Sequence, residues 1–195
     1  MNPDTALYEN HPDNVLMELI TEGDTSAFDE LYKRYSKRLL YYFYRMLRGD
    51  DATAQDFLQD IFFKIAEKPN LYRSNECFST WIFTIAHNLC KNEYRRRSVR
   101  KIIKTDNEMD SYTDKIGCDE HSTIKKLDQN QFNEMLLTEL KSFDEIHKTT
   151  FLLRYQENFS IKEISAIIKC SEGTVKSRLF YTTKKLAESL KEFGL

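Results

Sequence analysis

The chain has 195 residues, a formal net charge of −2, and a composition that is 41% hydrophobic and 13% aromatic. This aromatic content excludes wholesale disorder, and the length suffices for one large or two small domains with their own cores. No apolar run approaches the roughly 18–20 residues of a membrane span, and the N-terminus lacks the basic and apolar regions of a signal peptide. We therefore expect a cytoplasmic protein without membrane insertion.

Four cysteines are widely spaced along the chain, at Cys77, Cys90, Cys118 and Cys170. Free thiols are the expectation for such spacing. The pairs His87-x-x-Cys90 and Cys118-x-x-His121 could together supply two His and two Cys ligands to zinc. The first pair falls in an apolar helical stretch and the second in a predicted linker, so we expect no metal site. No Gly-rich phosphate loop and no Ser-His-Asp or Cys-His constellation occurs, so we predict no catalytic residue and no cofactor.

Apolar residues recur at helical spacing through most of the N-terminal half. A short helix is predicted to end at Gly23, a long one at Gly49, and a third covers residues 52–67. Residues 69–79 are predicted to form a loop, and the next helix starts at Trp81 and continues into a cluster of arginines. No strand-like alternation of useful length occurs, so the predicted fold class is all-α.

The periodicity breaks over residues 103–128, where polar and acidic side chains predominate. This segment is predicted to be a flexible linker between two small helical domains, residues 13–102 and residues 129–195. Charge alternates along the same region, because residues 80–104 are strongly basic and residues 105–145 are strongly acidic. An acidic protein of this kind suits DNA binding within a larger assembly, since a free-standing DNA binder usually carries a net basic domain.

The chain closes with a helix-turn-helix pattern over residues 160–186. Ser160 is followed three residues later by Glu163, the signature of a capping box, and Ser171 is placed to cap the second helix. That helix keeps an apolar seam from Val175 onward and leaves hydroxyl, basic and aromatic side chains on its other faces. Such side chains suit a recognition helix that contacts phosphates and base edges. An ordinary helical hairpin with a solvated basic face is the alternative.

A second candidate surface lies on the predicted helix 52–67. The side chains opposite its apolar face, at spacing i, i+3, i+4 and i+7, are Asp56, Gln59, Asp60 and Phe63. An aromatic anchor beside acidic groups suits docking against a basic helical partner. The alternative is that Phe63 completes the core.

Three motifs resemble the domains of bacterial RNA polymerase sigma factors. Residues 173–179, Gly-Thr-Val-Lys-Ser-Arg-Leu, resemble the recognition helix of sigma domain 4. Residues 54–62 resemble the polymerase-binding helix of sigma domain 2, and residues 78–88 resemble its promoter-melting segment. A related Thr-Val-Lys motif ends the DNA-binding domain of response regulators, but the short two-domain layout is similar to the extracytoplasmic-function (ECF) group of sigma factors.

The resemblance implies a transcription initiation factor without enzymatic activity, whose partners are core RNA polymerase and promoter DNA. Domain 2, residues 13–102, would bind the clamp helices of the polymerase β′ subunit through the acidic and aromatic stripe, and would read and open the −10 element. Domain 4, residues 129–195, would bind the β-flap and read the −35 element. An anti-sigma factor is the expected regulatory partner.

The resemblance also implies DNA contacts for particular residues. Those expected at the −10 element and in strand opening are Tyr72, Asn75, Phe78, Trp81, Asn88, Lys91, Asn92, Arg95 and Arg96. Those expected at the −35 element are Gly173, Thr174, Lys176, Ser177, Arg178, Phe180 and Tyr181. An extruded base that stacks on aromatic rings can offset the cost of unpairing, which fits the aromatic residues of the first set.

Two departures from the family pattern carry consequences. Lys169 stands where the family usually has glycine, which costs about 1 kcal/mol if the turn is left-handed. Residues 180–183, Phe-Tyr-Thr-Thr, replace an Arg-rich segment, which predicts fewer phosphate contacts and an altered −35 preference.

Two other functions are alternatives to a sigma factor. A conventional DNA-binding regulator would lack the paired clamp and melting helices, and a nucleic-acid enzyme would need a metal or nucleophile site.

Overall fold

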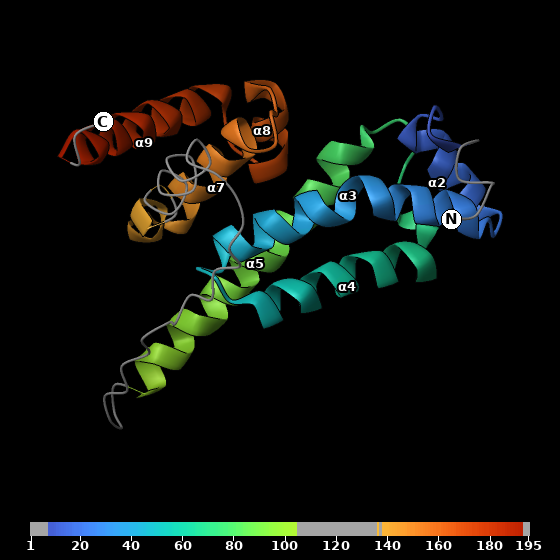
Figure 1. Ribbon diagram of the computed structural model, residues 1–195, viewed down its shortest axis with the longest axis horizontal. Helices are drawn as coiled ribbons and strands as arrows, with labels where there is room; N and C mark the ends of the chain where they lie inside the picture. Colours follow the sequence, from blue (N-terminus) through green and yellow to red (C-terminus); the bar gives the residue numbers. More distant parts are fainter. Residues whose placement is uncertain (1–7, 105–135, 137, 193–195) are drawn as a thin grey trace, which may run out of the picture.

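The computed structural model describes residues 8–104, 136 and 138–192 (Figure 1). Its principal elements are α2 (Asp13–Thr21), α3 (Thr25–Met46), α4 (Asp51–Glu67), the short 3-10 turn η1 (Pro69–Leu71), α5 (Phe78–Lys104), α7 (Glu145–Tyr155), α8 (Ile161–Ile168) and α9 (Glu172–Glu192). No strand occurs within the described residues, and none of their helices is long and apolar enough to cross a lipid bilayer. The predicted all-α fold is confirmed.

Side-chain caps determine where the two long helices of the N-terminal half begin. Asp24 accepts hydrogen bonds from backbone N–H groups in the first turn of α3, at 2.8 and 3.1 Å. Asp50 accepts one from the Thr53 N–H at 3.1 Å and starts α4. Gly49 makes the turn between the two helices with φ +95°, a conformation that residues with side chains rarely adopt. The predicted break at Gly49 therefore has a backbone reason.

Helix α3 is the centre of the N-terminal half and packs against α2, α4 and α5. One of its faces is fully buried along almost the whole helix, at Ala27, Leu31, Leu39, Tyr42, Phe43 and Met46. Phe43 meets Phe57 of α4 and Tyr42 meets Phe83 of α5, each with ring centroids 5.5 Å apart in an edge-on arrangement. This packing fixes α4 and α5 and leaves their outer faces free to carry function.

Helices α7, α8 and α9 contain the predicted helix-turn-helix. Ser160 Oγ accepts a hydrogen bond from the Glu163 N–H at 3.2 Å, and the Glu163 carboxylate accepts one from the Ser160 N–H at 2.8 Å. The capping box is therefore confirmed. At the turn Lys169 adopts φ 53°, the left-handed conformation that glycine would fill without strain. Ser171 Oγ then accepts a hydrogen bond from the Thr174 N–H at 3.1 Å and caps α9.

The two halves pack directly against each other, with α8 against α5 and α7 against α3 (Figure 1). Phe159 of the C-terminal half meets Phe83 of α5 edge-on, with ring centroids 5.1 Å apart. Arg38 Nε of α3 donates to the Glu157 carboxylate at 3.0 Å. Buried residues of both halves form one hydrophobic cluster.

The predicted linker, residues 103–128, lies outside the described residues except at its start. Helix α5 continues to Lys104 and so includes the first two residues of that segment. Helix α5 thus extends slightly further than the boundary at residue 102 that the sequence predicts.

Candidate protein and nucleic-acid interfaces

Helix α4 carries the acidic and aromatic stripe on a solvent-exposed face. Ala54, Leu58 and Ile61 point into the core, and the helical repeat therefore leaves the stripe, Asp56, Gln59, Asp60 and Phe63, exposed on the other side. The Phe63 side chain is 65% exposed, so the alternative that it completes the core is wrong. In Figure 1, α4 lies on the opposite side of α3 from α7 and α9. The stripe is an exposed apolar anchor with carboxylates beside it.

The aromatic residues expected at the opened DNA form a compact cluster. Ring centroids of Tyr72, Phe78 and Trp81 lie 5.4 to 5.6 Å from one another. Tyr72 and Phe78 are buried, and only Trp81 is half-exposed. In this arrangement neither Tyr72 nor Phe78 presents an open ring face of the kind that a stacked base needs. Their assignment to the −10 element stays a prediction. These two rings instead hold the loop and Trp81 in place.

A cleft of about 310 Å³ lies between this loop and the end of α2. Its walls are Met17, Glu18, Thr21, Glu22, Pro69, Asn70, Tyr72 and Ser74. The loop is held from inside by the Tyr72 hydroxyl, which donates to the Glu76 carbonyl at 2.5 Å. Asn75 is exposed on the same loop. The predicted loop, residues 69–79, is shorter in the structure, because η1 covers Pro69–Leu71 and α5 already begins at Phe78, three residues before the predicted start at Trp81. The sequence also did not reveal the wall from α2, because no sequence pattern joins Glu18 to a loop fifty residues later.

The outer face of α5 is polar and basic. Its exposed members are Asn88, Lys91, Asn92, Arg95 and Arg96, all predicted to contact the −10 element. The helix also contains buried Glu93, whose carboxylate binds Arg96 at 2.6 Å and Arg97 at 2.8 Å. Arg96 is therefore partly neutralised, whereas no ion pair with a described residue involves Lys91 or Arg95. The basic face is narrower than the sequence suggests.

His87 marks where the basic face of α5 meets the C-terminal half. Burial, followed by the charges of Lys91 and Arg178, lowers the pKa of His87 to about 4. The imidazole is therefore neutral at pH 7. Since the charge of Arg178 acts on His87, this residue of α9 lies near the middle of α5. Cys90, one turn further, is buried, which raises the pKa of its thiol.

Helix α9, the predicted recognition helix, presents hydroxyl, basic and aromatic side chains on its outer face. Gly173, Lys176 and Ser177 are exposed near its start, while Thr174 is half-buried beside the cap. Phe180 and Tyr181 are 71% and 59% exposed, so they lie outside the core. These residues form a continuous outer face of one helix, as the sequence predicts.

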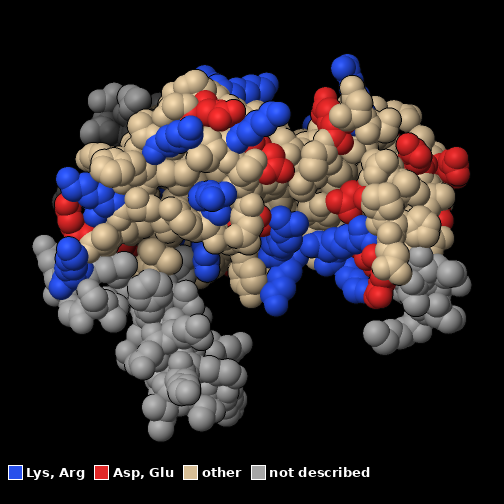
Figure 2. Space-filling model, turned by 90° about the horizontal axis from the view of Figure 1, so that it is seen from above, with Lys and Arg blue, Asp and Glu red and all other residues tan. Residues whose placement is uncertain are grey.

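Arg178 lies at the edge of this outer face of α9. It is half-buried, and its guanidinium approaches Cys170 Sγ at 3.8 Å. Figure 2 shows that the basic side chains on the face seen from above gather over the C-terminal half and the middle of the molecule, with acidic ones more frequent toward α2.

Among residues 8–104, 136 and 138–192, no group of three or more potential metal ligands comes together. The pair His87 and Cys90 belongs to the packed side of α5. The second pair, Cys118 and His121, lies outside the described residues.

Both halves match family models of sigma factors. Residues 31–100 match Sigma-70 region 2, and residues 133–186 match Sigma-70 region 4. The chain is 32% identical over 184 residues to the ECF RNA polymerase sigma-E factor of Haemophilus influenzae, covering 88% of this chain and 92% of that protein. It is 28% identical over 182 residues to the RNA polymerase sigma-H factor of Pseudomonas aeruginosa, covering 91% and 93% of the two chains.

Solved structures share the fold. The complex of CnrH with the cytosolic domain of CnrY matches with a TM-score of 0.66 and 18% identity over 92% of this chain and 97% of CnrH. The sigma factor RpoE of Bartonella quintana, in complex with the anti-sigma factor NepR, matches with a TM-score of 0.68 and 21% identity over 84% and 96% of the chains. Together with the two family models, the relatives show that this chain belongs to the ECF sigma factors, which direct core RNA polymerase to promoters and have no enzymatic activity of their own.

Proposed function

We propose that this sigma factor divides its task among three surfaces: the outer face of α4 docks on core polymerase, α5 contacts the −10 element, and α9 contacts the −35 element. The observation that best supports this proposal is the stripe on α4, where Phe63 is 65% exposed beside Asp56 and Asp60. An exposed aromatic ring is costly to leave in water, and flanking carboxylates select a basic partner. The clamp helices of the β′ subunit are the proposed partner.

A charge-reversal experiment tests this docking surface. The double variant Asp60→Arg, Phe63→Ala should lose at least tenfold in affinity for core polymerase, because it removes the anchor and reverses a steering charge. Asp29→Arg with Tyr41→Ala is the matched control, since it changes the same kinds of exposed group on α3. Binding would be measured by fluorescence anisotropy, with helicity checked by circular dichroism. Equal affinity of the two double variants rejects the docking surface.

For the −10 element, we propose that Trp81 offers the stacking face while Asn88, Lys91 and Asn92 contact the adjacent strand. Tyr72 and Phe78 support Trp81 from the core. This division of roles explains why only one of the three rings needs an open face. Asn75, Arg95 and Arg96 are proposed as further contacts.

Permanganate reactivity of promoter thymines measures strand opening directly. Asn88→Ala with Lys91→Ala should reduce it severalfold while leaving polymerase binding intact, because neither side chain belongs to the core. Val99→Ala, an exposed change on the same helix, is the control. Normal reactivity in the double variant would remove α5 from the melting mechanism.

For the −35 element, we propose that the N-terminal turn of α9, Gly173 and Thr174, approaches phosphate, while Lys176, Ser177 and Arg178 contact the duplex. Phe180 and Tyr181 would supply apolar contacts such as those to thymine methyl groups.

We propose that the chain divides into domain 2 over residues 13–102 and domain 4 over residues 129–195, with residues 103–128 between them. The β-flap is the proposed polymerase partner of domain 4.

Regulation by an anti-sigma protein in the cytoplasm is the remaining part of the proposal. It is supported by the fold shared with the sigma factor RpoE of Bartonella quintana, which was solved in complex with the anti-sigma factor NepR. Affinity purification of this chain from its own host, followed by identification of stoichiometric partners, tests it. Recovery of core polymerase subunits alone, with no second partner under inducing and non-inducing growth, argues against such a regulator.

A further inference from the structure

One side of α5 meets the C-terminal half of the chain over three turns. The side chains at spacing i, i+4 and i+8 on this side, which we call the contact stripe, are Phe83, His87 and Lys91. The first meets the Phe159 ring with centroids 5.1 Å apart, the charge of Arg178 on α9 acts on the second, and the charge of the third acts on Glu145 of α7. The contact stripe is therefore part of the packing between the two halves.

His87 is the titratable imidazole of the contact stripe, and its surroundings disfavour a proton. Its Nδ1 is buried and has no hydrogen-bond partner among the described residues. The two charged groups that act on the ring, Lys91 and Arg178, are both cations. Helix α8 also packs against α5, and none of its described side chains adds a charge that acts on the ring. A proton on His87 therefore meets burial and two positive charges at once.

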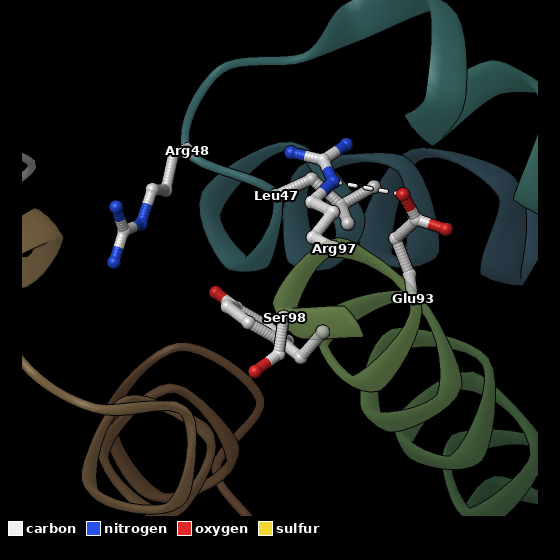
Figure 3. Close-up of a pocket in the computed structure, with 6 residues that line it drawn as sticks. Leu47, Arg48, Glu93, Arg97 and Ser98 are labelled. Carbon is white, nitrogen blue, oxygen red and sulfur yellow. Dashed lines mark hydrogen bonds and ion pairs between the residues drawn. The ribbon is translucent and has the colours of Figure 1, made fainter. Parts of the chain in front are cut away.

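The carboxylates around the middle of α5 have other partners. Glu93 is buried and binds Arg96 at 2.6 Å and Arg97 at 2.8 Å. Figure 3 shows the pair of Glu93 and Arg97 beside a cavity of about 300 Å³ at the end of α3. Glu145 of α7 interacts with Lys91. Within the described part of the chain no carboxylate acts on the imidazole of the contact stripe, so nothing there compensates its protonation.

The protonation of His87 distinguishes packed halves from separated ones. Burial, and then the charges of Lys91 and Arg178, lower the pKa of His87 from its ordinary value of 6.5 to about 4. When the halves separate, the ring meets water and loses Arg178 as a neighbour, so its pKa returns toward the ordinary value. Between these two values the separated halves hold a proton at His87 that the packed halves do not. The packing therefore loses stability as the pH falls through this window.

We propose that His87 is a proton-sensitive contact between the two halves: its neutral ring lets α8 and α9 pack against α5, and its protonation at acidic pH separates them. Lys91 and Arg178 repel the added charge, and the contact between Phe83 and Phe159 is what that repulsion must overcome. Histidine suits this task because its charge changes near physiological pH. Separation also uncovers half-buried Arg178, which belongs to the proposed −35 surface; this last consequence rests on the proposed function.

Other titratable groups between the halves act outside this window or in the opposite direction. Burial raises the pKa of Glu145 above its ordinary value of 4.5, so its protonation favours the packed halves and opposes His87 as the pH approaches that value. Lys148 of α7 has a pKa of about 8 and is mostly protonated below it. Between pH 7.5 and pH 5.5 His87 therefore dominates, and the equilibrium should shift about tenfold toward separated halves.

Energy transfer between fluorophores on α4 and α9 of the full chain measures this equilibrium. Phe159→Leu weakens the contact with Phe83 without adding a titratable group, and so brings both arrangements into measurable range. In this background, separation should increase about tenfold from pH 7.5 to pH 5.5, and adding His87→Gln should leave a change of less than about twofold. His147→Gln, which removes a histidine that pairs with Asp144, is the control and should keep the tenfold response.

Titration of the His87 ring by nuclear magnetic resonance in the parent chain is the second measurement, and it should give a pKa of about 4. A pKa near the ordinary value overturns the proposal, and so does an equal pH response with and without His87→Gln. Circular dichroism at each pH follows the helices. If helicity falls together with the energy transfer, acid unfolds the protein instead of separating its halves, and the proposal is wrong. Neither polymerase nor promoter is used, so failure leaves the proposed promoter function untouched.

Discussion

At the scale of single residues, Lys148 is a side chain whose burial lowers the free energy of unfolding. Its pKa of about 8 is lower than the ordinary value of 10.5. Between these two values the unfolded chain binds more protons than the folded one, so the free energy of unfolding rises with pH over this window. Below pH 8 the folded protein carries the full cost of the buried charge.

We predict that Lys148→Met raises the free energy of unfolding by about 1–3 kcal/mol at pH 7, because it removes an unpaired buried cation while keeping most of the packing. The gain should shrink as the pH approaches 10. Urea denaturation at pH 7 and pH 10, without phosphate in the buffer, measures both effects. A variant that is less stable than the parent at pH 7 would show that Lys148 has a partner that compensates its charge.

The burial of Lys148 also shows what single residues in a sequence do not reveal. A lysine in an amphipathic helix is expected to face water, and nothing near Lys148 in the chain contradicts that expectation. Its burial follows from the packing of α7 against the end of α3, more than a hundred residues earlier. Phe63 was easier to predict, because its exposure follows from the helical repeat of α4 itself.

At the scale of elements, helix ends were predictable wherever local chemistry determines them. The capping box of Ser160 and Glu163 and the break at Gly49 are decided within a few residues of chain. The aromatic cluster behind Trp81 was not, because a loop has no periodicity that separates an inward ring from an outward one. Tyr72 and Phe78 are buried through contacts with one another and with α3, as in the 5.1 Å ring contact between Tyr35 and Phe78.

The turn of the helix-turn-helix provides a prediction at this scale. Lys169 adopts φ 53° and ψ 55°, so Lys169→Gly should raise the free energy of unfolding by about 0.5–1 kcal/mol through relief of left-handed strain. Ala166→Gly, an exposed change inside α8, is the control and should lower it by a similar amount. Thermal unfolding resolves the opposite signs. If both variants lose stability, the strain at Lys169 is already compensated by its surroundings.

At the scale of the whole molecule, the packing of the two halves depends on a small number of polar contacts around an apolar centre. Glu157 is almost fully buried, with 2% of its side chain exposed, and its carboxylate accepts hydrogen bonds from Arg38 at 3.0 Å and from Gln156 at 2.5 Å. Gln156 in turn accepts a hydrogen bond from Arg45 at 2.9 Å. The Arg38 guanidinium also lies 5.4 Å from the Phe83 ring centroid. No motif in either half predicts this contact, because its members come from α3 and from the end of α7.

Reversing one charge of this contact should separate the halves without unfolding either. Arg38→Glu places a second carboxylate against buried Glu157, which we expect to weaken the packing by about 1–3 kcal/mol, since Arg38 itself is partly exposed. Energy transfer between fluorophores on α4 and α9 should fall in this variant. The double variant Arg38→Glu, Glu157→Arg restores opposite charges and should recover part of the transfer. If Arg38→Glu leaves the energy transfer unchanged, the apolar contact between Phe83 and Phe159 is sufficient to hold the halves together.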